Sequence, residues 1–365
     1  MKRVISVVGA RPNFMKVAPI DRAFKKYSDT VEHLIIHTGQ HYGAKMSDAF
    51  FQELEMPKPA VFLGISSGSH AEQTARIMVE FEKALLEVKP DLVIVVGDVN
   101  STIACALTAV KLHIPVAHVE AGLRSNDRSM PEEINRLATD AICDFCFVTE
   151  ESGMKFLKTQ GFPEDKTYFV GNTMIDSQHF ALQKADRSNI LQETEIEKGK
   201  YVLVTLHRPS NVDEPEQLKS ILKVVGELSE KRDVIFPIHP RTRKNIDSFG
   251  LNELLKNVKF IEPQGYLDFL ALMKNADFVL TDSGGIQEET TALQIPCITV
   301  RKTTERPVTV EVGTNILIEP TPEAMKTAID DMLTKPRKQG QIPPLWDGRA
   351  AERITEIIVT QILHY

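Results

Sequence analysis

The sequence predicts an α/β fold made of two doubly wound (Rossmann-like) domains that face each other across a cleft. Short apolar runs of β-type residues alternate with amphipathic stretches from end to end, a pattern typical of parallel strands covered by helices on both faces. A polar segment at residues 182–200 interrupts the alternation once, near the middle of the chain. A chain of 365 residues is also long for a single core, so two domains are the natural expectation.

The individual elements follow from these runs. Apolar residues recur at intervals of three and four in 71–88 and 101–112, which predicts helices there. We place the first domain at 1–180, a polar linker at 181–200 and the second domain at 201–348. We expect a final helix, 349–365, to pack back on the first domain. The predicted strands are 4–8, 33–37, 92–96, 116–119 and 145–148 in the first domain, and 201–206, 234–238, 258–261, 278–281 and 295–300 in the second.

Composition excludes several classes of function. The apolar fraction of 42% and the charged fraction of 25% are those of an ordinary soluble globular protein. The net charge of −7, from 43 basic and 50 acidic residues, disfavours a nucleic acid or an anionic membrane as partner. The chain has no apolar run near the eighteen or so residues of a membrane span, and no signal-peptide pattern. We therefore expect a cytoplasmic protein with no membrane partner.

The four cysteines are too few for a disulfide framework in a chain of this size, which agrees with a reducing compartment. Cys143 and Cys146 have the CxxC spacing of a redox or zinc motif, but they overlap the apolar run 145–148 and no second CxxC accompanies them. Core packing is the favoured interpretation and chemistry the alternative. Without HExxH, DxD or paired CxxC we predict no metal, and we expect no cofactor.

The most informative segment is 278–289, which joins an apolar strand to a helix through Ser283-Gly284-Gly285. Unpaired amides at a helix start, beside glycines that let a ligand approach, bind a diphosphate without any lysine. Glu289 lies roughly 9 Å further along the helix axis, at about 1.5 Å per residue, which suits the hydroxyls of a ribose. The alternative is a tight turn with solvent-facing glutamates.

In the first domain, charged residues follow strands at the edge where ligands of parallel sheets bind. Arg11 and Lys16 follow the first strand, in a glycine turn that is not the dinucleotide motif GxGxxG, and can hold phosphate or form surface ion pairs. Asp98 either acts chemically or caps a helix. Glu120 leaves an apolar strand, which is costly unless it is paired or poised for chemistry. Glu132 begins a helix, where it also suits the helix dipole.

In the second domain, His207 leaves the first strand and can donate to a phosphate or transfer a proton, although a lone histidine is more often structural. Gln264 and the backbone near Phe269 form a turn able to address the edge of a uracil. Arg306 offers a further cation near a helix start.

Together, residues 9–12, 97–102, 118–124, 131–136, 206–208, 282–289 and 303–307 resemble the motifs of the non-hydrolysing UDP-N-acetylglucosamine 2-epimerases of bacteria and archaea. The resemblance covers nearly the whole chain, in order. It implies a GT-B fold, a homodimer, and interconversion of UDP-N-acetylglucosamine and UDP-N-acetylmannosamine through elimination and re-addition of UDP. It marks Asp98, Glu120, Glu132 and His207 as catalytic, and Arg11, Lys16, Gln264, Phe269, Ser283, Gly284, Gly285, Glu289 and Arg306 as ligands of the UDP-sugar.

The chain departs from the bacterial pattern at several points. Asn13 and Pro209-Ser210 stand where many members have other residues. Segments 130–132 and 206–208 also look like those of 2-epimerases that act on UDP-diacetamido uronic acid sugars. A second alternative is a GT-B glycosyltransferase that uses a UDP-sugar. The segment 40–42, which matches an activator site of some members, is followed by a departure at 42–43.

Overall fold

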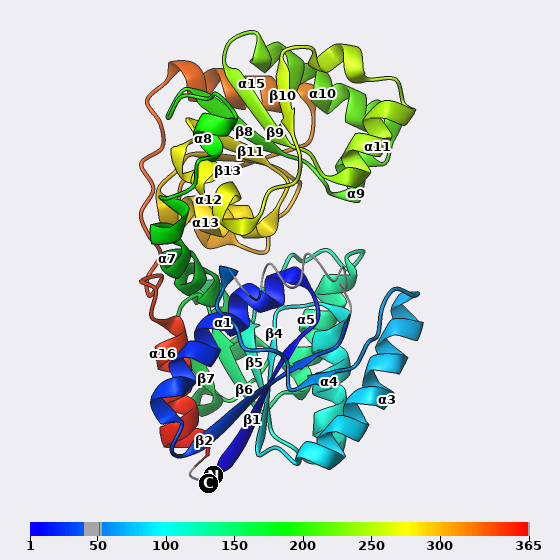
Figure 1. The fold of residues 1–365 in the computed structure, drawn as a ribbon, viewed down its shortest axis with the longest axis vertical. Coiled ribbons are helices and arrows are strands. Elements are labelled where there is room, and N and C mark those ends of the chain that lie inside the picture. Colours follow the sequence, from blue (N-terminus) through cyan, green and yellow to red (C-terminus); the bar gives the residue numbers. More distant parts are fainter. Residues whose placement is uncertain (40–50, 52, 364–365) are drawn as a thin grey trace. The chain divides into compact units, whose positions relative to one another are not determined.

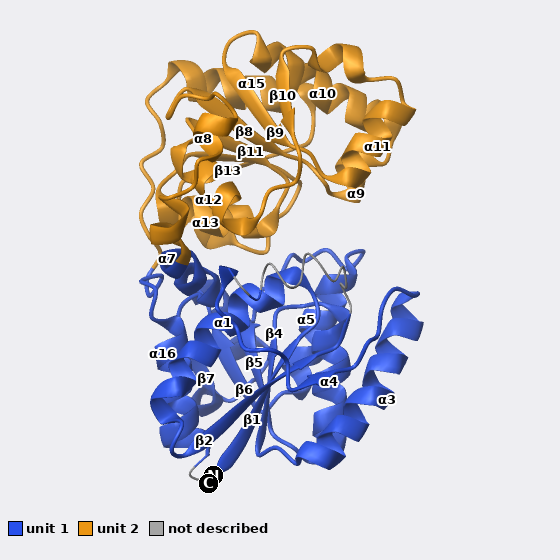
Figure 2. Ribbon diagram, in the orientation of Figure 1, with its two compact units in different colours: residues 1–180, 344–365 blue, residues 181–343 orange. Residues whose placement is uncertain are grey.

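The computed structural model describes residues 1–39, 51 and 53–363, so the predicted activator segment 40–42 lies outside the described residues. The chain divides into two compact units, which are described separately. Unit 1 comprises residues 1–180 and 344–365, and unit 2 comprises residues 181–343 (Figure 2). Among the described residues, no helix combines the length and the apolar character needed to cross a bilayer.

Unit 1 is built on a parallel sheet with the strand order β3-β2-β1-β4-β5-β6-β7 (Figure 1). The central strand β4 has all five side chains buried, because helices cover both faces of the sheet. The strands are β1 (Lys2–Val8), β2 (Val31–His37), β3 (Val61–Phe62), β4 (Leu92–Val96), β5 (Val116–Ala121), β6 (Phe145–Val148) and β7 (Thr167–Phe169).

A capping residue and an apolar stripe fix helix α3 of unit 1. Ser69 caps α3, since its hydroxyl accepts from the Glu72 amide while the Glu72 carboxylate accepts from the Ser69 amide. Ile77, Phe81 and Leu85 then face the core from the same helix. The helices are α1 (Arg11–Phe24), α3 (His70–Val88), α4 (Asn100–Lys111), α5 (Pro131–Ile142), α6 (Glu151–Thr159), α7 (Thr173–Ala185) and α16 (Ala350–Ile357), with single turns at Lys25–Tyr27 and Glu164–Lys166 and a π-helical end at Ile358–Ile362.

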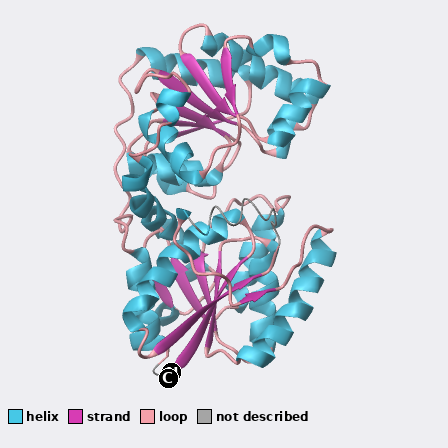
Figure 3. Ribbon diagram, viewed as in Figure 1, coloured by secondary structure: helices cyan, strands magenta, loops and turns pink. Residues whose placement is uncertain are grey.

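Unit 2 repeats this plan with the order β10-β9-β8-β11-β12-β13, again fully parallel and covered by helices (Figure 3). The α/β class with two doubly wound parallel sheets is therefore confirmed. Its strands are β8 (Tyr201–Thr205), β9 (Asp233–Pro237), β10 (Val258–Ile261), β11 (Phe278–Thr281), β12 (Cys297–Val300) and β13 (Asn315–Ile318). Its helices are α8 (Ile190–Glu193), α9 (Pro209–Val212), α10 (Pro215–Ser229), α11 (Pro240–Ser248), α12 (Tyr266–Asn275), α13 (Gly284–Leu293), α14 (Pro307–Glu311) and α15 (Pro322–Thr334), with a 3-10 turn at Asn252–Leu255.

Two features differ from the sequence expectation. The segment 181–200 is grouped with unit 2, where the Ser188 hydroxyl donates to Asp268 at 2.5 Å, and α7 crosses the boundary between the units at residues 180–181. Strands β3, β7 and β13 were not predicted, since they are edge strands of two to four residues with mostly partly exposed side chains, and their apolar runs are short.

The C-terminal segment belongs to unit 1. The amides of Ala350 and Ala351, at the start of α16, donate to the Asp176 carboxylate at 3.1 and 2.7 Å. Lys26, just beyond α1, pairs with Glu352 at 2.6 Å. Trp346 is buried and donates to the carbonyl of Thr149 at 3.0 Å. The last helix is thus joined to unit 1 by hydrogen bonds and ion pairs as well as by apolar packing.

Candidate active site

The strand order of each sheet reverses direction at one point, and ligands of doubly wound sheets bind at the carboxyl ends of the strands there. In unit 1 this point lies between β1 and β4, and in unit 2 between β8 and β11. Arg11 and Asp98 follow β1 and β4, while His207 and Ser283 follow β8 and β11. The strand order therefore brings four predicted site residues to the two switch points, two in each unit.

Asn13 organises the turn after β1. Its side-chain oxygen accepts from the amides of Gly9 and Ala10 at 3.0 and 2.9 Å, and its nitrogen donates to the Val96 carbonyl at 3.1 Å. The ends of β1 and β4 are thereby tied together. A side chain on Gly9 would collide with Ser101, whose hydroxyl would lie 2.2 Å from the added carbon. The turn leaves Arg11 exposed at the first position of α1.

Lys16 and Glu120 form an ion pair in which both side chains are buried. The alternative that Lys16 forms an ion pair on the surface is therefore wrong. The Glu120 backbone has a φ of 73°, at a point where the register between β5 and β6 shifts. A positive φ at a glutamate is strained, and such strain persists where the surrounding structure fixes it. Gly97 leaves room for Lys16, because a side chain there would lie 2.8 Å from the ammonium. The cation and the candidate acid are therefore positioned together.

Asp98 is held by Arg136 of α5. The Nε and Nη2 atoms of Arg136 donate to the same carboxylate oxygen at 3.0 and 2.7 Å, and Nη1 donates to Glu133 at 2.7 Å. Asn135 donates to the Asp98 carbonyl at 2.9 Å. The side chain of Asp98 remains 20% exposed while that of Arg136 is only 3% exposed, so the acid is the more accessible member of the pair. Helix capping does not account for these contacts.

The two consecutive glutamates at the start of α5 have different surroundings. Glu133 is buried and accepts from the amides of Ser125 and Asn126 at 2.9 and 3.1 Å, so it fixes the preceding loop. Glu132 is half-buried and lies one helical turn before Arg136, on the same face of the helix. Glu132 is thus on the side of α5 that faces the end of β4.

Beneath these residues, a buried ionic network connects both candidate acids. His118 contacts Asp140 through Nδ1 at 2.7 Å and the Gly97 carbonyl through Nε2 at 2.8 Å. Asp140 also accepts from the Gly122 amide at 3.0 Å and pairs with Arg124 at 2.7 Å. The network thereby holds the residue before Asp98 and the backbone just after Glu120.

Burial alone would raise the pKa of Asp140, but the hydrogen bond and charge of His118, together with Arg124, outweigh it and lower the pKa. The donor atoms of His118, Asp140 and Cys143 lie within 4.8 Å of one another, a spacing open to a metal. A cation there would lie against Arg124, however, and both His118 nitrogens already face acceptors. The donor set fits an ionic network better than a metal site.

The two cysteines of the CxxC segment also pack in the core of unit 1. The sulfur of Cys143 lies 3.4 Å from that of Cys146, and both residues are buried. Burial raises the pKa of the Cys146 thiol, which disfavours the reactive thiolate. These observations favour the core-packing interpretation.

In unit 2, His207 is oriented by Asp282. The Asp282 carboxylate is fully buried and lies 3.0 Å from Nδ1 of His207, whose side chain is 45% exposed. It also accepts from the amides of His207 and Arg208 and from Asn211. Burial would raise the pKa of Asp282, but His207 and the hydrogen bonds from Arg208 and Asn211 lower it. An ionised Asp282 fixes the proton on Nδ1 and leaves Nε2 for proton exchange or phosphate binding.

The segment after β11 forms the predicted helix start. Ser283 is the N-cap residue of α13, its side chain makes no capping hydrogen bond, and Gly284 and Gly285 open the helix, all three partly exposed. Glu288 and Glu289 are buried, so the alternative of solvent-facing glutamates is wrong. The amide groups at this amino end suit an anion.

The remaining predicted ligands of unit 2 lie on α13, in the turn before α12 and on α12, and just before α14. Glu289 accepts from the Tyr266 hydroxyl of α12 at 2.8 Å, which ties α13 to the helix that carries Phe269. Gln264 lies in the turn before α12, and its side chain donates to the Glu262 carbonyl at 2.6 Å. Arg306 is buried and donates to Glu288 at 2.7 Å. Glu289 and Arg306 are thus tied to α13 and its neighbours, while Gln264 and Phe269 lie on either side of Tyr266 near the start of α12.

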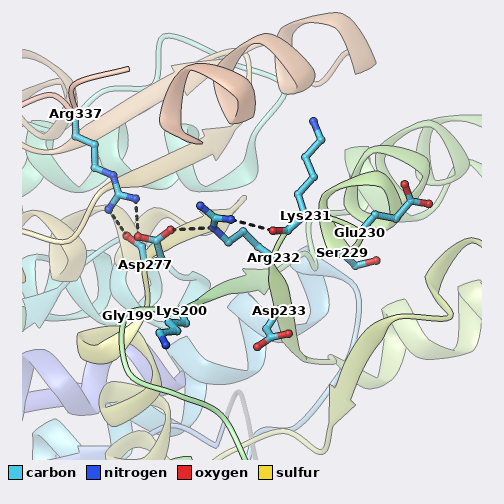
Figure 4. A pocket seen from close by; sticks show the side chains of 9 residues that line it. All are labelled: Gly199, Lys200, Ser229, Glu230, Lys231, Arg232, Asp233, Asp277 and Arg337. Carbon is cyan, nitrogen blue, oxygen red and sulfur yellow. Dashed lines mark hydrogen bonds and ion pairs between the residues drawn. The ribbon is translucent and has the colours of Figure 1, made fainter. Parts of the chain in front are cut away.

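A surface cavity of about 580 Å³ lies at the amino ends of the strands of the unit 2 sheet, opposite the carboxyl ends that carry Ser283 and His207 (Figure 4). Lys200 and Asp277 line it where β8 and β11 begin, and Asp233 lines it at the first position of β9. Figure 4 shows Asp277 between Arg232 and Arg337, and these cations pair with it. The cavity is far from the switch point and its arginines are already paired, so we do not assign the active site to it.

Comparison with known proteins agrees with this geometry. The family model described as UDP-N-acetylglucosamine 2-epimerase matches residues 23–359. The chain belongs to the UDP-N-acetylglucosamine 2-epimerase family. A UDP-N-acetylglucosamine 2-epimerase of Methanocaldococcus jannaschii is 46% identical to it over 360 residues, which cover 96% of this chain and 97% of that one.

Two further relatives inform the comparison within the 2-epimerase family. The crystal structure of the M. jannaschii UDP-GlcNAc 2-epimerase in complex with UDP-GlcNAc and UDP is similar to this chain, with a TM-score of 0.89 and 46% identity. The match covers 98% of this chain and 99% of the M. jannaschii chain. A UDP-2,3-diacetamido-2,3-dideoxy-D-glucuronate 2-epimerase of Pseudomonas aeruginosa is 39% identical over 360 residues, with 98% and 99% coverage. Both substrate types considered from the sequence thus occur among relatives.

The sequence analysis assigned no role to three residues that hold the candidate site residues in place: Asp282, Arg136 and Asp140. Asp282 stands directly after an apolar strand, as Asp98 nearly does, and that position was the available signal. Arg136 and Asp140 lie on α5, and the charged positions of a helix do not show which strand end they face. Their partners Asp98 and His118 become evident only in the folded chain.

Proposed function

We propose that this chain is a non-hydrolysing UDP-N-acetylglucosamine 2-epimerase that interconverts UDP-N-acetylglucosamine and UDP-N-acetylmannosamine. The proposal rests on one observation: a chain of this family carries oriented carboxylates in one unit and groups suited to bind a diphosphate in the other. Unit 1 holds oriented carboxylates at its switch point, and unit 2 holds a helix amino end with an oriented histidine at its own. Family membership and the relatives at 46% identity support the substrate.

The chemistry explains why the reaction needs both sets. The hydrogen on C2 of the sugar has no adjacent carbonyl, so its direct removal faces a high barrier. Elimination of UDP breaks the C1–O bond and the C2–H bond together and gives a 2-acetamidoglucal. Return of a proton to the other face of C2, with re-addition of UDP at C1, gives the epimer. The diphosphate must therefore leave, stay bound and return.

In unit 2, the amino end of α13 would hold the diphosphate through the amides at Ser283, Gly284 and Gly285. His207 and Arg306 would stabilise the negative charge that develops on the leaving oxygen, since donors fixed in advance act most strongly there. Glu289 would accept from the ribose, while Gln264 and the backbone near Phe269 would address the base. Arg11 and Lys16 of unit 1 are the remaining proposed ligands of the UDP-sugar.

In unit 1, Asp98 and Glu120 would transfer the protons on the two faces of C2, and Glu132 would stabilise positive charge at C1. The ion pair with Arg136 holds the Asp98 carboxylate in a fixed orientation, and Asp98 is the more exposed member of that pair. Glu120 lies against Lys16, and this pair can pass a proton to or from C2 of the sugar. We further propose a cytoplasmic homodimer that needs no cofactor.

Incubation with UDP-N-acetylglucosamine in deuterated water tests the proposal. The expected result is deuterium at C2 and a mixture of two UDP-sugars, detected by NMR and mass spectrometry. Recovery of unlabelled substrate as the only sugar would refute it. Free N-acetylmannosamine with released UDP would indicate a hydrolysing enzyme, and transfer of sugar to an added acceptor would indicate a glycosyltransferase.

The second candidate substrate is a UDP-diacetamido uronic acid sugar, favoured by the relative from P. aeruginosa. Its carboxylate at C6 requires a cation that N-acetylglucosamine does not. The same incubation with the UDP-diacetamido glucuronate discriminates between the two. A kcat/KM higher for the uronic acid sugar than for UDP-N-acetylglucosamine would replace the first substrate with the second.

A further inference from the structure

Arg301 lies directly after β12, at the same carboxyl edge of the unit 2 sheet as Ser283. Its amide donates to the Ile318 carbonyl at 3.0 Å, which fixes its backbone against β13. The neighbouring strand β11 leads into α13, so Arg301 stands one strand away from the helix start. The residue is only 6% exposed, although it carries a permanent charge.

The guanidinium has one satisfied end and one unsatisfied end. Nη2 donates to Oε2 of Glu305 at 2.9 Å. Nη1 is buried and, among the described residues, has no hydrogen-bond partner. A buried guanidinium nitrogen without an acceptor is unfavourable, and native structures rarely keep one without a reason.

The unsatisfied nitrogen lies beside the amino end of α13. A Cβ built on Gly284 would lie 3.7 Å from Nη1 of Arg301 and 2.9 Å from Oε1 of Glu305. The helix has ten residues, and the side chain of its N-cap residue leaves the first amides uncapped. The buried donor and the helix amides therefore converge on one location.

Other charges surround the same location. Burial lowers the pKa of Arg301, the Glu305 carboxylate opposes this, and the nearby cations Arg208 and Arg306 add to the lowering. Nη2 of Arg208 lies 3.9 Å from Oε1 of Glu305, and Arg306 is paired with Glu288. Arg208, Arg301 and Arg306 thus gather around the carboxylates of Glu305 and Glu288, and Arg301 directs a buried donor, which has no acceptor among the described residues, towards the start of α13.

We propose that Arg301 is a phosphate ligand, whose Nη1 donates to an oxygen of the nucleoside diphosphate at the amino end of α13 while Nη2 stays on Glu305. This inference rests on the proposed function, because it names a further ligand of the same UDP half-site. Glu305 acts as a positioning residue that fixes the plane of the guanidinium. The planar fork of arginine can serve two acceptors in this way, whereas lysine offers only a point charge.

The test measures binding of UDP and of uridine to the full chain by calorimetry and by ligand-observed NMR. For Arg301→Gln we expect about a 10- to 100-fold loss of UDP affinity, the range of a hydrogen bond to a charged group, with uridine affinity changed less than about threefold. Arg301→Lys keeps the charge and should lose less UDP affinity than Arg301→Gln.

The matched control is Arg337→Gln, which removes an arginine from the opposite edge of the same sheet, where its partner is Asp277. It should bind UDP as the unaltered chain does. If Arg301→Gln and Arg301→Lys both bind UDP within about threefold of the unaltered chain, the proposal is wrong. Equal losses for UDP and uridine would assign Arg301 to the fold of unit 2 instead, which also overturns it. Because no sugar is turned over, failure here is distinct from failure of the epimerase assay.

Discussion

Unit 2 repeats the order of the first six strands across the sheet of unit 1, and each unit has its own switch point, but the exposed member of the ion pair at that point differs. In unit 1 the acid Asp98 is 20% exposed and its partner Arg136 is 3% exposed. In unit 2 the base His207 is 45% exposed and its partner Asp282 is fully buried. A buried ion needs a partner, and the fold decides which member of each pair is turned outward. Similar frameworks therefore expose a carboxylate in one unit and an imidazole in the other.

The comparison predicts first that Asp98→Asn abolishes catalysis but not nucleotide binding. We expect deuterium incorporation at C2 to fall by about 10³- to 10⁴-fold, the contribution of a positioned acid–base group. UDP affinity should change less than about threefold, since the proposed diphosphate site lies in unit 2. Mass spectrometry of the UDP-sugars and calorimetry with UDP check both parts.

Asp330→Asn provides a matched control, because Asp330 pairs with Lys231 on the surface of unit 2 and has no proposed role. Its turnover should equal that of the unaltered chain. An Asp98→Asn variant that retains a tenth or more of the turnover would remove Asp98 from the chemistry.

The second prediction concerns the buried pair of unit 1. Lys16→Met leaves Glu120 buried without its cation and should lower the free energy of unfolding by about 3–5 kcal/mol, measured by urea denaturation. Lys2→Met removes a pair exposed to solvent and should cost at most about 1 kcal/mol. Adding Glu120→Gln to Lys16→Met should recover stability but not turnover. Equal losses for Lys16→Met and Lys2→Met would contradict the importance of burial.

The third prediction concerns the orienting acid of unit 2. Asp282→Asn removes the charge that fixes the proton on Nδ1 of His207 and should reduce kcat by about 10- to 100-fold. Proton–nitrogen NMR of the imidazole should show loss of the single Nδ1-protonated form. Unchanged NMR signals together with reduced kcat would mean that Asp282 only supports the turn.

The smallest expected effect is the dependence of stability on pH. An ordinary aspartate has a pKa of about 3.9. The pKa values of Asp140 and Asp282 in the folded chain are lower than this. Each group therefore contributes stability above its unfolded pKa, and that stability is lost as pH falls from about 4 through the folded pKa. Urea denaturation between pH 7 and pH 3 should show this decline. The decline should be shallower in Asp282→Asn, and an identical slope would refute the linkage.

The Arg301 proposal extends the comparison between the units. In unit 1 the buried cations Lys16 and Arg136 hold the candidate acids. In unit 2 the buried acid Glu305 holds Arg301, and Glu288 holds Arg306. Sequence reasoning missed Arg301, although a charged residue directly after the apolar strand β12 was a usable signal.

The fold class and the placement of the motifs were predictable from the sequence because both depend on local periodicity. Apolar runs such as Leu92–Val96 indicate buried parallel strands, and the residues after them lie at the ligand-binding edge. The helix start at Ser283 was predictable for the same reason, since glycines after a strand mark a βα turn. The edge strands β3 and β7 were not predicted, because apolar runs of two or three residues do not distinguish a strand from a loop that packs on the core.

The sequence by itself determined the fold class, the central strands, the residues that follow them and the resemblance to a family. Only the tertiary structure decided which charge meets which. Asp98 pairs with Arg136, 38 residues away, and the amide of His207 donates to Asp282, 75 residues away. The positive φ of Glu120 and the buried Nη1 of Arg301 are likewise outcomes of packing. A charged residue has many possible partners along a chain, and long-range packing selects the one that can offset the cost of its burial.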